Sequence, residues 1–188
     1  MLTHGAGGNA NAPLLLALAE GFAAGGLTVL RYDLPYRQER PTGPPRPGGA
    51  AKDREGLRSA VASIRASVTG HVFLGGQSYG GRQASMLAAS QPGLADALLL
   101  LSYPLRPPRR GSELRTAHLP DLRTPTLFVH GSRDPFGSPE DIEAARRLIP
   151  VRTALVAVPG AGHDLFRAPS RAGADIAAEI VSKFLQFV

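Results

Sequence analysis

The strongest constraint on the fold is a regular alternation between short apolar runs and longer segments with helical spacing. The apolar runs cover residues 2–4, 27–32, 71–74, 97–102, 126–130 and 154–158. Short runs of this kind are typical of strands buried on both faces of a parallel sheet. Helix candidates lie at about residues 12–24, 51–68, 79–91, 139–148 and 171–187. The alternation predicts a doubly wound α/β fold, with a mostly parallel sheet of about six strands flanked by helices, in one domain over residues 1–188.

Two segments interrupt this alternation. Residues 34–50 are rich in Pro and Gly and predict a long surface loop, and residues 104–125 form a second irregular stretch. The first strand begins at Met1 and has only about four residues before Gly5. We expect a fold truncated at its N-terminus. Either the natural start lies upstream of Met1 or the fold has lost a leading hairpin, and the sequence leaves both open.

The composition excludes several classes of function. The absence of cysteine rules out disulfides, thiolate metal sites and a cysteine nucleophile. The net charge is +6, but the arginines are scattered and form no basic stripe, so we expect no nucleic-acid partner. The five histidines lack ligand-like spacing, so we expect no metal and no cofactor. No segment approaches the ~18 apolar residues of a transmembrane helix, and the first residues do not resemble a signal peptide, so we expect a cytoplasmic protein without a membrane partner.

One serine stands among four glycines where a predicted strand meets a predicted helix. The segment Gly76-Gln77-Ser78-Tyr79-Gly80 matches G-x-S-x-G and follows an apolar run. In such a turn a strained backbone exposes the serine hydroxyl, and the flanking positions have no room for side chains. The motif alone is weak evidence, but its position between strand and helix predicts a nucleophile at Ser78.

A nucleophilic serine needs a histidine base and an orienting carboxylate, which we expect at the ends of later strands in the order Ser, acid, His. Asp134 follows the run at 126–130, and His163 follows the run at 154–158. These two residues are the predicted acid and base. Asp164 is the main rival acid, and Asp33 fits the chain order poorly because it precedes the serine.

Two backbone N–H groups are expected to form an oxyanion hole. One belongs to Tyr79, at the start of the helix after the serine, and the other to Ala6, in the sharp turn "HGAGG", with Gly7 as the alternative. His4 is expected to brace this turn by hydrogen bonds.

Four segments together resemble the α/β-hydrolase superfamily: "LTHGAGG", "GGQSYGGR", "PTLFVHGSRDPFG" and "GAGHD". The resemblance spans nearly the whole chain. Within the superfamily, the chain is similar to the small capless branch of dienelactone-hydrolase-like and KANL-type proteins. It implies Ser78 as nucleophile, Asp134 as acid, His163 as base, and an oxyanion hole from Ala6 and Tyr79. Dienelactone hydrolases proper use cysteine where this chain has Ser78, so their substrate is not implied.

These residues predict a serine hydrolase that cleaves a carboxylester or thioester of a small acyl substrate. Only about 23 residues separate the fourth and fifth predicted strands, too few for a cap domain, so we expect an open site. Candidate pocket residues are Tyr79, Tyr103, Phe136, Phe166, His118 and the arginines at 106, 109 and 110.

Two alternatives remain. A non-catalytic scaffold with a hydrolase fold is one, and the other is a dinucleotide-binding protein, because Gly5-x-Gly7-x-x-Ala10 and Asp33 mimic a Rossmann fingerprint. The chain is also a possible homo-oligomer.

Overall fold

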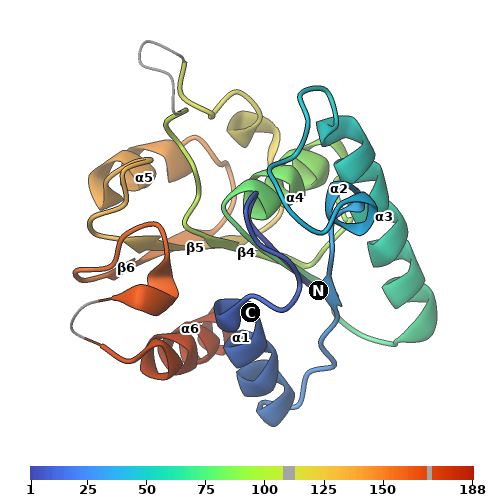
Figure 1. The fold of residues 1–188 in the computed structure, drawn as a ribbon, viewed down its shortest axis with the longest axis horizontal. Helices are drawn as coiled ribbons and strands as arrows, with labels where there is room; N and C mark the ends of the chain where they lie inside the picture. Colours follow the sequence, from blue (N-terminus) through green and yellow to red (C-terminus); the bar gives the residue numbers. More distant parts are fainter. Residues whose placement is uncertain (108–112, 169–170) are drawn as a thin grey trace.

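A six-stranded, fully parallel sheet organises the structure, a computed structural model that describes residues 1–107, 113–168 and 171–188 (Figure 1). The strands are β1 (Leu2–Thr3), β2 (Arg31–Tyr32), β3 (Phe73–Gln77), β4 (Ala97–Leu101), β5 (Thr126–Gly131) and β6 (Thr153–Val158). Their order is β2-β1-β3-β4-β5-β6. The chain therefore moves outward from β1 in one direction and then returns to build the sheet in the other, which makes the boundary between β1 and β3 the topological switch point. In open α/β sheets, ligands bind at this point, beyond the carboxyl ends of the strands.

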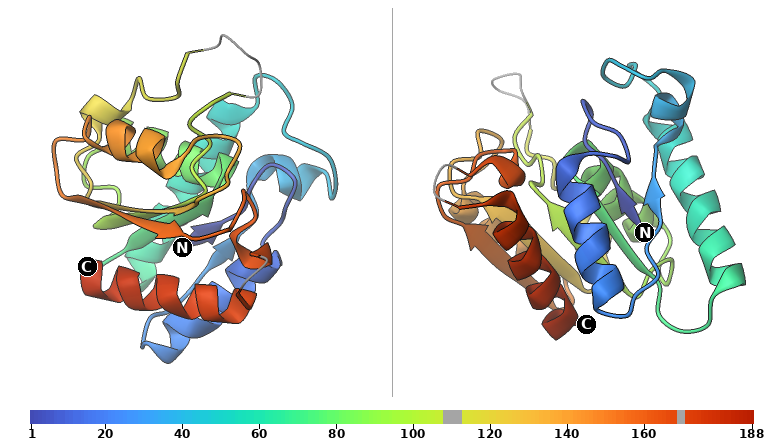
Figure 2. Two further views of the ribbon diagram at one scale, coloured as in Figure 1. Left: turned by 90° about the vertical axis from the view of Figure 1, so that its left-hand side faces the viewer. Right: turned by 60° about the horizontal axis from the view of Figure 1, so that its bottom comes forward.

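Helices cover both faces of the sheet. Their bounds are α1 Pro13–Ala24, α2 Pro35–Glu39, α3 Ala50–Ser67, α4 Tyr79–Ser90, α5 Pro139–Arg146 and α6 Gly173–Phe187, with 3-10 turns η1 Leu119–Asp121 and η2 Leu165–Arg167. Figure 2 shows α1 and α6 side by side on one face, where the rings of Phe22 and Phe184 meet at 5.6 Å. Helices α3, α4 and α5 pack on the opposite face. This arrangement confirms the predicted doubly wound α/β class.

Strand β4 shows why the apolar runs in the sequence lack alternation. Leu99 and Leu101 belong to the core under α1 and α6, whereas Leu98 and Leu100 belong to the core under α3, α4 and α5. All four side chains are at most 1% exposed. A strand covered on both faces must be apolar at every position.

Two boundaries differ from the prediction. Residues 34–50 do not form a loop throughout, because Pro35 starts the short helix α2, whose Tyr36 and Arg37 are buried. Of the predicted strand at 27–32, only Arg31 and Tyr32 form ladder pairs with β1, although the carbonyl of Leu30 also accepts a hydrogen bond from the N–H of Leu2 at 2.8 Å. None of the helices within the described residues combines the length and apolarity needed to cross a membrane.

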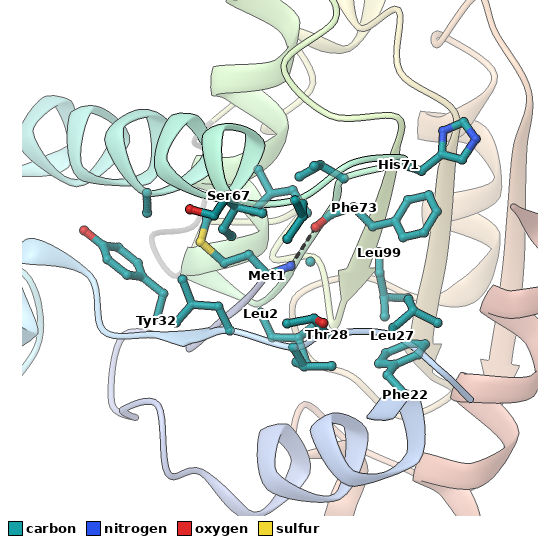
Figure 3. Close-up of a pocket in the computed structure, with 18 of the residues that line it drawn as sticks. Met1, Leu2, Phe22, Leu27, Thr28, Tyr32, Ser67, His71, Phe73 and Leu99 are labelled. Atoms are coloured by element: carbon teal, nitrogen blue, oxygen red, sulfur yellow. Dashed lines mark hydrogen bonds between the residues drawn. The ribbon is translucent and has the colours of Figure 1, made fainter. Parts of the chain in front are cut away.

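An apolar cavity of about 590 Å³ lies between residues 27–30 and β3 (Figure 3). Its lining includes Leu27, Phe73 and Leu99. The N-terminal ammonium of Met1 lies in it and donates a hydrogen bond to the Phe73 carbonyl at 2.7 Å. Burial lowers the pKa of this amine from 8.0 to about 6, because a charge is poorly solvated in apolar surroundings.

A four-residue extension fused ahead of Met1 is expected to change the pH dependence of the stability of the fold. In the parent, the amine of the unfolded chain is protonated below about pH 8, whereas the amine of the folded chain is protonated only below about pH 6. The free energy of unfolding therefore rises with pH over this window, by about 2–3 kcal/mol for this group alone. The extension moves the ammonium out of the cavity and removes this component. Urea unfolding of both chains between pH 5.5 and 8.5 measures it, and identical pH slopes would contradict the expectation.

Candidate active site

The turn between β3 and α4 carries Ser78 in a strained conformation. Its φ of 49° and ψ of −114° lie in a region that residues with a side chain rarely adopt. The glycines around it allow the chain to approach itself: a Cβ on Gly76 would lie 2.5 Å from the nitrogen of Gly81, and one on Gly80 would lie 2.5 Å from the carbonyl oxygen of His4. Such strain persists only where the surrounding structure enforces it, and it is concentrated at functional sites.

Three side chains, which follow β3, β5 and β6, meet at this turn. His163 Nε2 lies 2.8 Å from Ser78 Oγ, and His163 Nδ1 lies 2.8 Å from Asp134 Oδ2. Asp134 is 6% exposed and follows β5, whereas His163 follows β6 and is partly exposed. The carboxylate can only accept a hydrogen bond, so it holds the imidazole proton on Nδ1 and leaves Nε2 to accept the hydroxyl proton.

His130 supports the turn that carries Asp134, and no motif in the sequence indicates this role. This fully buried side chain lies four residues before Asp134, with Nε2 3.6 Å from Asp134 Oδ2. Its Nε2 is 2.8 Å from the carbonyl of Gly137, so it closes the turn that presents the acid. Burial lowers the pKa of His130 and keeps the ring neutral. Asp134 Oδ1 accepts a hydrogen bond from the N–H of Phe136 at 2.8 Å within the same turn.

A cavity of about 700 Å³ opens over Ser78 and His163. The loop after β1, residues 5–9, forms one wall, and Phe136, Phe166 and Arg167 form another. Phe136 packs against the imidazole of His163, with ring centroids 4.5 Å apart. The two phenylalanines therefore line the cavity as predicted.

The predicted pocket roles of Tyr79 and Tyr103 are wrong. The Tyr79 hydroxyl instead donates to the buried carboxylate of Asp53 at 2.6 Å, and burial raises its pKa. Tyr103 is 1% exposed and its hydroxyl donates to the Arg115 carbonyl at 2.7 Å. Tyr103, two residues after β4, belongs to the core under α3, α4 and α5, and Tyr79 packs against that core.

Other candidate residues also have structural partners. His118 Nε2 lies 2.8 Å from Ser85 Oγ, outside the cavity lining, and Arg106 pairs with Asp141 at 2.7 Å. Asp33 accepts from the N–H of Ala10 at 2.6 Å, and Asp164 accepts from the N–H of Phe166 at 3.1 Å. Asp164 lines the cavity but lies outside the chain of hydrogen bonds to Ser78. Arg109 and Arg110 lie outside the described residues.

The backbone around Ser78 offers N–H donors without acceptors. Among the described residues, the N–H groups of Ala6 and Tyr79 donate no hydrogen bond to the backbone. Ala6 lines the cavity, and the adjacent Gly5 is so close that a Cβ there would lie 3.4 Å from the Cβ of Ser78. Tyr79 is the first residue of α4, where N–H groups have no partner within the helix. His4 braces this loop through its 2.8 Å contact with the Gly5 carbonyl, as predicted.

Comparison with known proteins gives this arrangement its family. The chain is 49% identical to the polyketide synthase ThaQ of Burkholderia thailandensis over 51 residues, which are 27% of this chain and only 2% of the synthase. The structure is similar to dienelactone hydrolase from Anabaena variabilis, with a TM-score of 0.79 and 24% identity over 100% of this chain and 85% of that one. It is also similar to a monoacylglycerol lipase from Paleococcus ferrophilus, with a TM-score of 0.78 and 16% identity over 100% and 93% of the two chains.

A sequence model of the family described as "Alpha/beta hydrolase domain" matches residues 1–187, nearly the whole chain. This match confirms the superfamily that the four motifs predicted and supports hydrolase activity. The chain belongs to the alpha/beta hydrolase domain family.

Proposed function

We propose that the chain is a serine hydrolase that cleaves a carboxylester or thioester through an acyl-enzyme, with Ser78 as nucleophile, His163 as base and Asp134 as the orienting acid. The observation that carries the proposal is the unbroken line of hydrogen bonds from Asp134 through His163 to a strained serine. A buried carboxylate, an imidazole and a hydroxyl in this order form the arrangement that activates serine in acyl transfer.

The proposed reaction proceeds in two halves. His163 Nε2 accepts the Ser78 proton as Oγ attacks the substrate carbonyl, and the N–H groups of Ala6 and Tyr79 bind the resulting oxyanion. Collapse of the tetrahedral intermediate breaks the bond to the alcohol or thiol, which leaves with the proton held by His163. Water then attacks the acyl-enzyme and gives a proton to His163. The second tetrahedral intermediate collapses, the acid product departs, and Ser78 Oγ takes that proton back from His163.

The cavity favours a small or protruding acyl group. None of the described residues between β4 and β5 lines the cavity at Ser78. Phe136 and Phe166 supply an apolar wall for the acyl or leaving group. The lipase among the structural neighbours also acts on an acyl ester, which agrees with this substrate class.

The dinucleotide-binding alternative has weaker support. Its fingerprint consists of the glycine loop after β1 and Asp33, and it leaves the alignment of Ser78, His163 and Asp134 unexplained. The non-catalytic scaffold shares the fold, so only a measurement of reactivity separates it from the enzyme.

A fluorophosphonate probe tests the proposal, because it reacts with an activated serine and loses fluoride. We expect labelling of the parent protein and none of Ser78→Ala. Ser90→Ala, at the exposed end of the same helix, is the matched control and should be labelled like the parent. A folded parent that stays unlabelled would favour the scaffold, and acyl esters and thioesters of graded chain length would then be expected to show no turnover.

A further inference from the structure

Two consecutive residues of α2, Tyr36 and Arg37, hold the loop after β1 from the side away from the cavity. Both are buried, with 7% and 5% of their surface exposed. They lie in the segment that the sequence predicts as a surface loop, and no step of the proposed mechanism uses them. Their polar atoms nevertheless donate hydrogen bonds to backbone carbonyls of residues 5–8, the loop that carries a proposed oxyanion donor.

Tyr36 fixes the first two carbonyl groups of this loop. Its hydroxyl lies 3.1 Å from the oxygen of Gly5 and 3.0 Å from that of Ala6. Burial raises the pKa of Tyr36, so the hydroxyl keeps the proton that it shares between the two carbonyls. The Gly5 oxygen also accepts from the N–H of Gly8 at 3.0 Å.

His4 adds a further hydrogen bond to the same carbonyl. Its Nε2 accepts from the N–H of Leu34 at 3.1 Å, so the ring carries its proton on Nδ1, which donates to the Gly5 oxygen at 2.8 Å. Burial lowers the pKa of His4 and keeps it in this neutral form.

Arg37 fixes the rest of the loop. Its Nε donates to the carbonyl of Gly8 at 2.7 Å, and one terminal nitrogen donates to those of Ala6 at 3.2 Å and Gly43 at 2.9 Å. No carboxylate within the described residues forms an ion pair with this guanidinium. The guanidinium also lies 5.1 Å from the centroid of the Tyr36 ring. A buried charge is costly unless it is well paired, so these contacts tie the charge closely to the position of the loop.

The geometry of the peptide bond turns these contacts into control of the N–H groups. In a trans peptide the C=O and N–H bonds point in opposite directions within one plane. Because the Gly5 carbonyl points toward Tyr36 and His4, the N–H of Ala6 in the same peptide points away from them. The Ala6 carbonyl, held by Tyr36 and Arg37, directs the N–H of Gly7 in the same manner. The opposite side of the loop is the cavity that Ser78 shares with Gly5, Ala6 and Gly7.

Tyr79, whose N–H is the other proposed oxyanion donor, is linked to Tyr36 through Asp53. Asp53, which is 1% exposed, accepts from the N–H of Tyr36 at 3.1 Å with one oxygen and from the hydroxyl of Tyr79 at 2.6 Å with the other. A single carboxylate thus joins the helix that holds the Ala6 loop to the residue whose N–H is the other donor.

We infer that Tyr36 and Arg37 are positioning residues, which orient the oxyanion-binding N–H of Ala6 by holding the carbonyls behind it. The inference rests on the proposed function. Loss of a whole oxyanion donor lowers kcat by about 10²–10³. Loosening the loop while the donor remains should therefore lower kcat by roughly 10–100-fold.

The test compares Tyr36→Phe and Arg37→Met with the parent on an activated ester. We expect kcat to fall by roughly 10–100-fold while KM stays within about twofold, because the ground-state carbonyl depends little on the oxyanion hole. An alkyl boronic acid, which forms a tetrahedral anionic adduct with the serine, should lose affinity by the same factor as kcat. Hydrogen exchange at the amides of residues 4–9 should become faster in both variants.

Tyr103→Phe is the matched control, since it also removes a buried hydroxyl bonded to a backbone carbonyl, but outside the cavity lining. It should lower the Tm without changing kcat or boronate affinity. If Arg37→Met fails to fold, Tyr36→Phe alone decides the test, because it removes one oxygen atom.

Unchanged kcat and unchanged exchange in a folded Tyr36→Phe would overturn the positioning role, as would a loss of kcat without a loss of boronate affinity. Ser78→Ala in parallel separates this failure from that of the proposed function. If the activity of the parent does not depend on Ser78, the proposed function fails first and the positioning role fails with it.

Discussion

His163→Ala is expected to lower kcat on an activated ester by about 10⁴–10⁶, the largest effect of any single substitution outside Ser78. Without the imidazole, Ser78 Oγ loses the one side chain among the described residues that is hydrogen-bonded to it and can take its proton. The remaining rate would come from the oxyanion donors and from substrate binding alone. KM should change little, since the imidazole acts mainly in the transition state.

Initial rates over a range of ester concentrations measure this effect, together with the rate of fluorophosphonate labelling. His71→Ala provides the control, because that side chain is 79% exposed and belongs to the loop at the opposite end of β3. Retention of more than about 1% of the parent kcat in His163→Ala would show that another group activates Ser78.

The positions of Ser78, Asp134 and His163 could be predicted because each follows a recognisable strand. Parallel strands bring their carboxyl ends to one edge of the sheet, so residues far apart in sequence must approach one another there. The sheet order places β3, β4, β5 and β6 consecutively, and the three side chains come from the ends of β3, β5 and β6. The local motifs therefore contained most of the information about this part of the site.

The holding contacts of Tyr36 and Arg37 could not be predicted in the same way. The prolines and glycines of residues 34–50 describe a local backbone preference, and a five-residue helix has too few positions to show a period. Both residues hold the loop after β1 through hydrogen bonds to residues about 30 positions earlier in the chain. Only the tertiary structure shows that these side chains are buried.

The directions in which individual side chains point could not be predicted from the sequence either. Tyr79 was expected in the pocket because it neighbours Ser78, but its ring turns toward Tyr36, with centroids 5.8 Å apart, and its hydroxyl reaches Asp53. Asp53 resembles an ordinary acidic residue in the first turn of a helix, yet it is almost fully buried. A fully buried carboxylate needs hydrogen-bond donors, and the N–H of Tyr36 and the hydroxyl of Tyr79 supply them, but both become neighbours of Asp53 only in the folded chain.

Asp134→Asn is expected to lower kcat by about 10⁴ while leaving the fold intact. The reason lies in the two partners of this carboxylate. Oδ1 accepts from the N–H of Phe136, and Oδ2 accepts from Nδ1 of His163. An asparagine has one acceptor oxygen, and the N–H of Phe136 requires it, so the amide NH₂ must face the imidazole. His163 would then accept at Nδ1 and carry its proton on Nε2, where it can no longer take the proton of Ser78.

The same comparison decides between the two candidate acids. Asp164 caps η2 and pairs with Arg167 at 3.3 Å, so Asp164→Asn should lower kcat by less than about tenfold. Asp96→Asn, at the opposite end of the sheet, should match the parent. The ¹⁵N shifts of the His163 ring supply a readout that is independent of turnover, because they report which nitrogen carries the proton. A wild-type tautomer in Asp134→Asn, or a larger loss of kcat in Asp164→Asn than in Asp134→Asn, would mean that Asp134 does not orient the base.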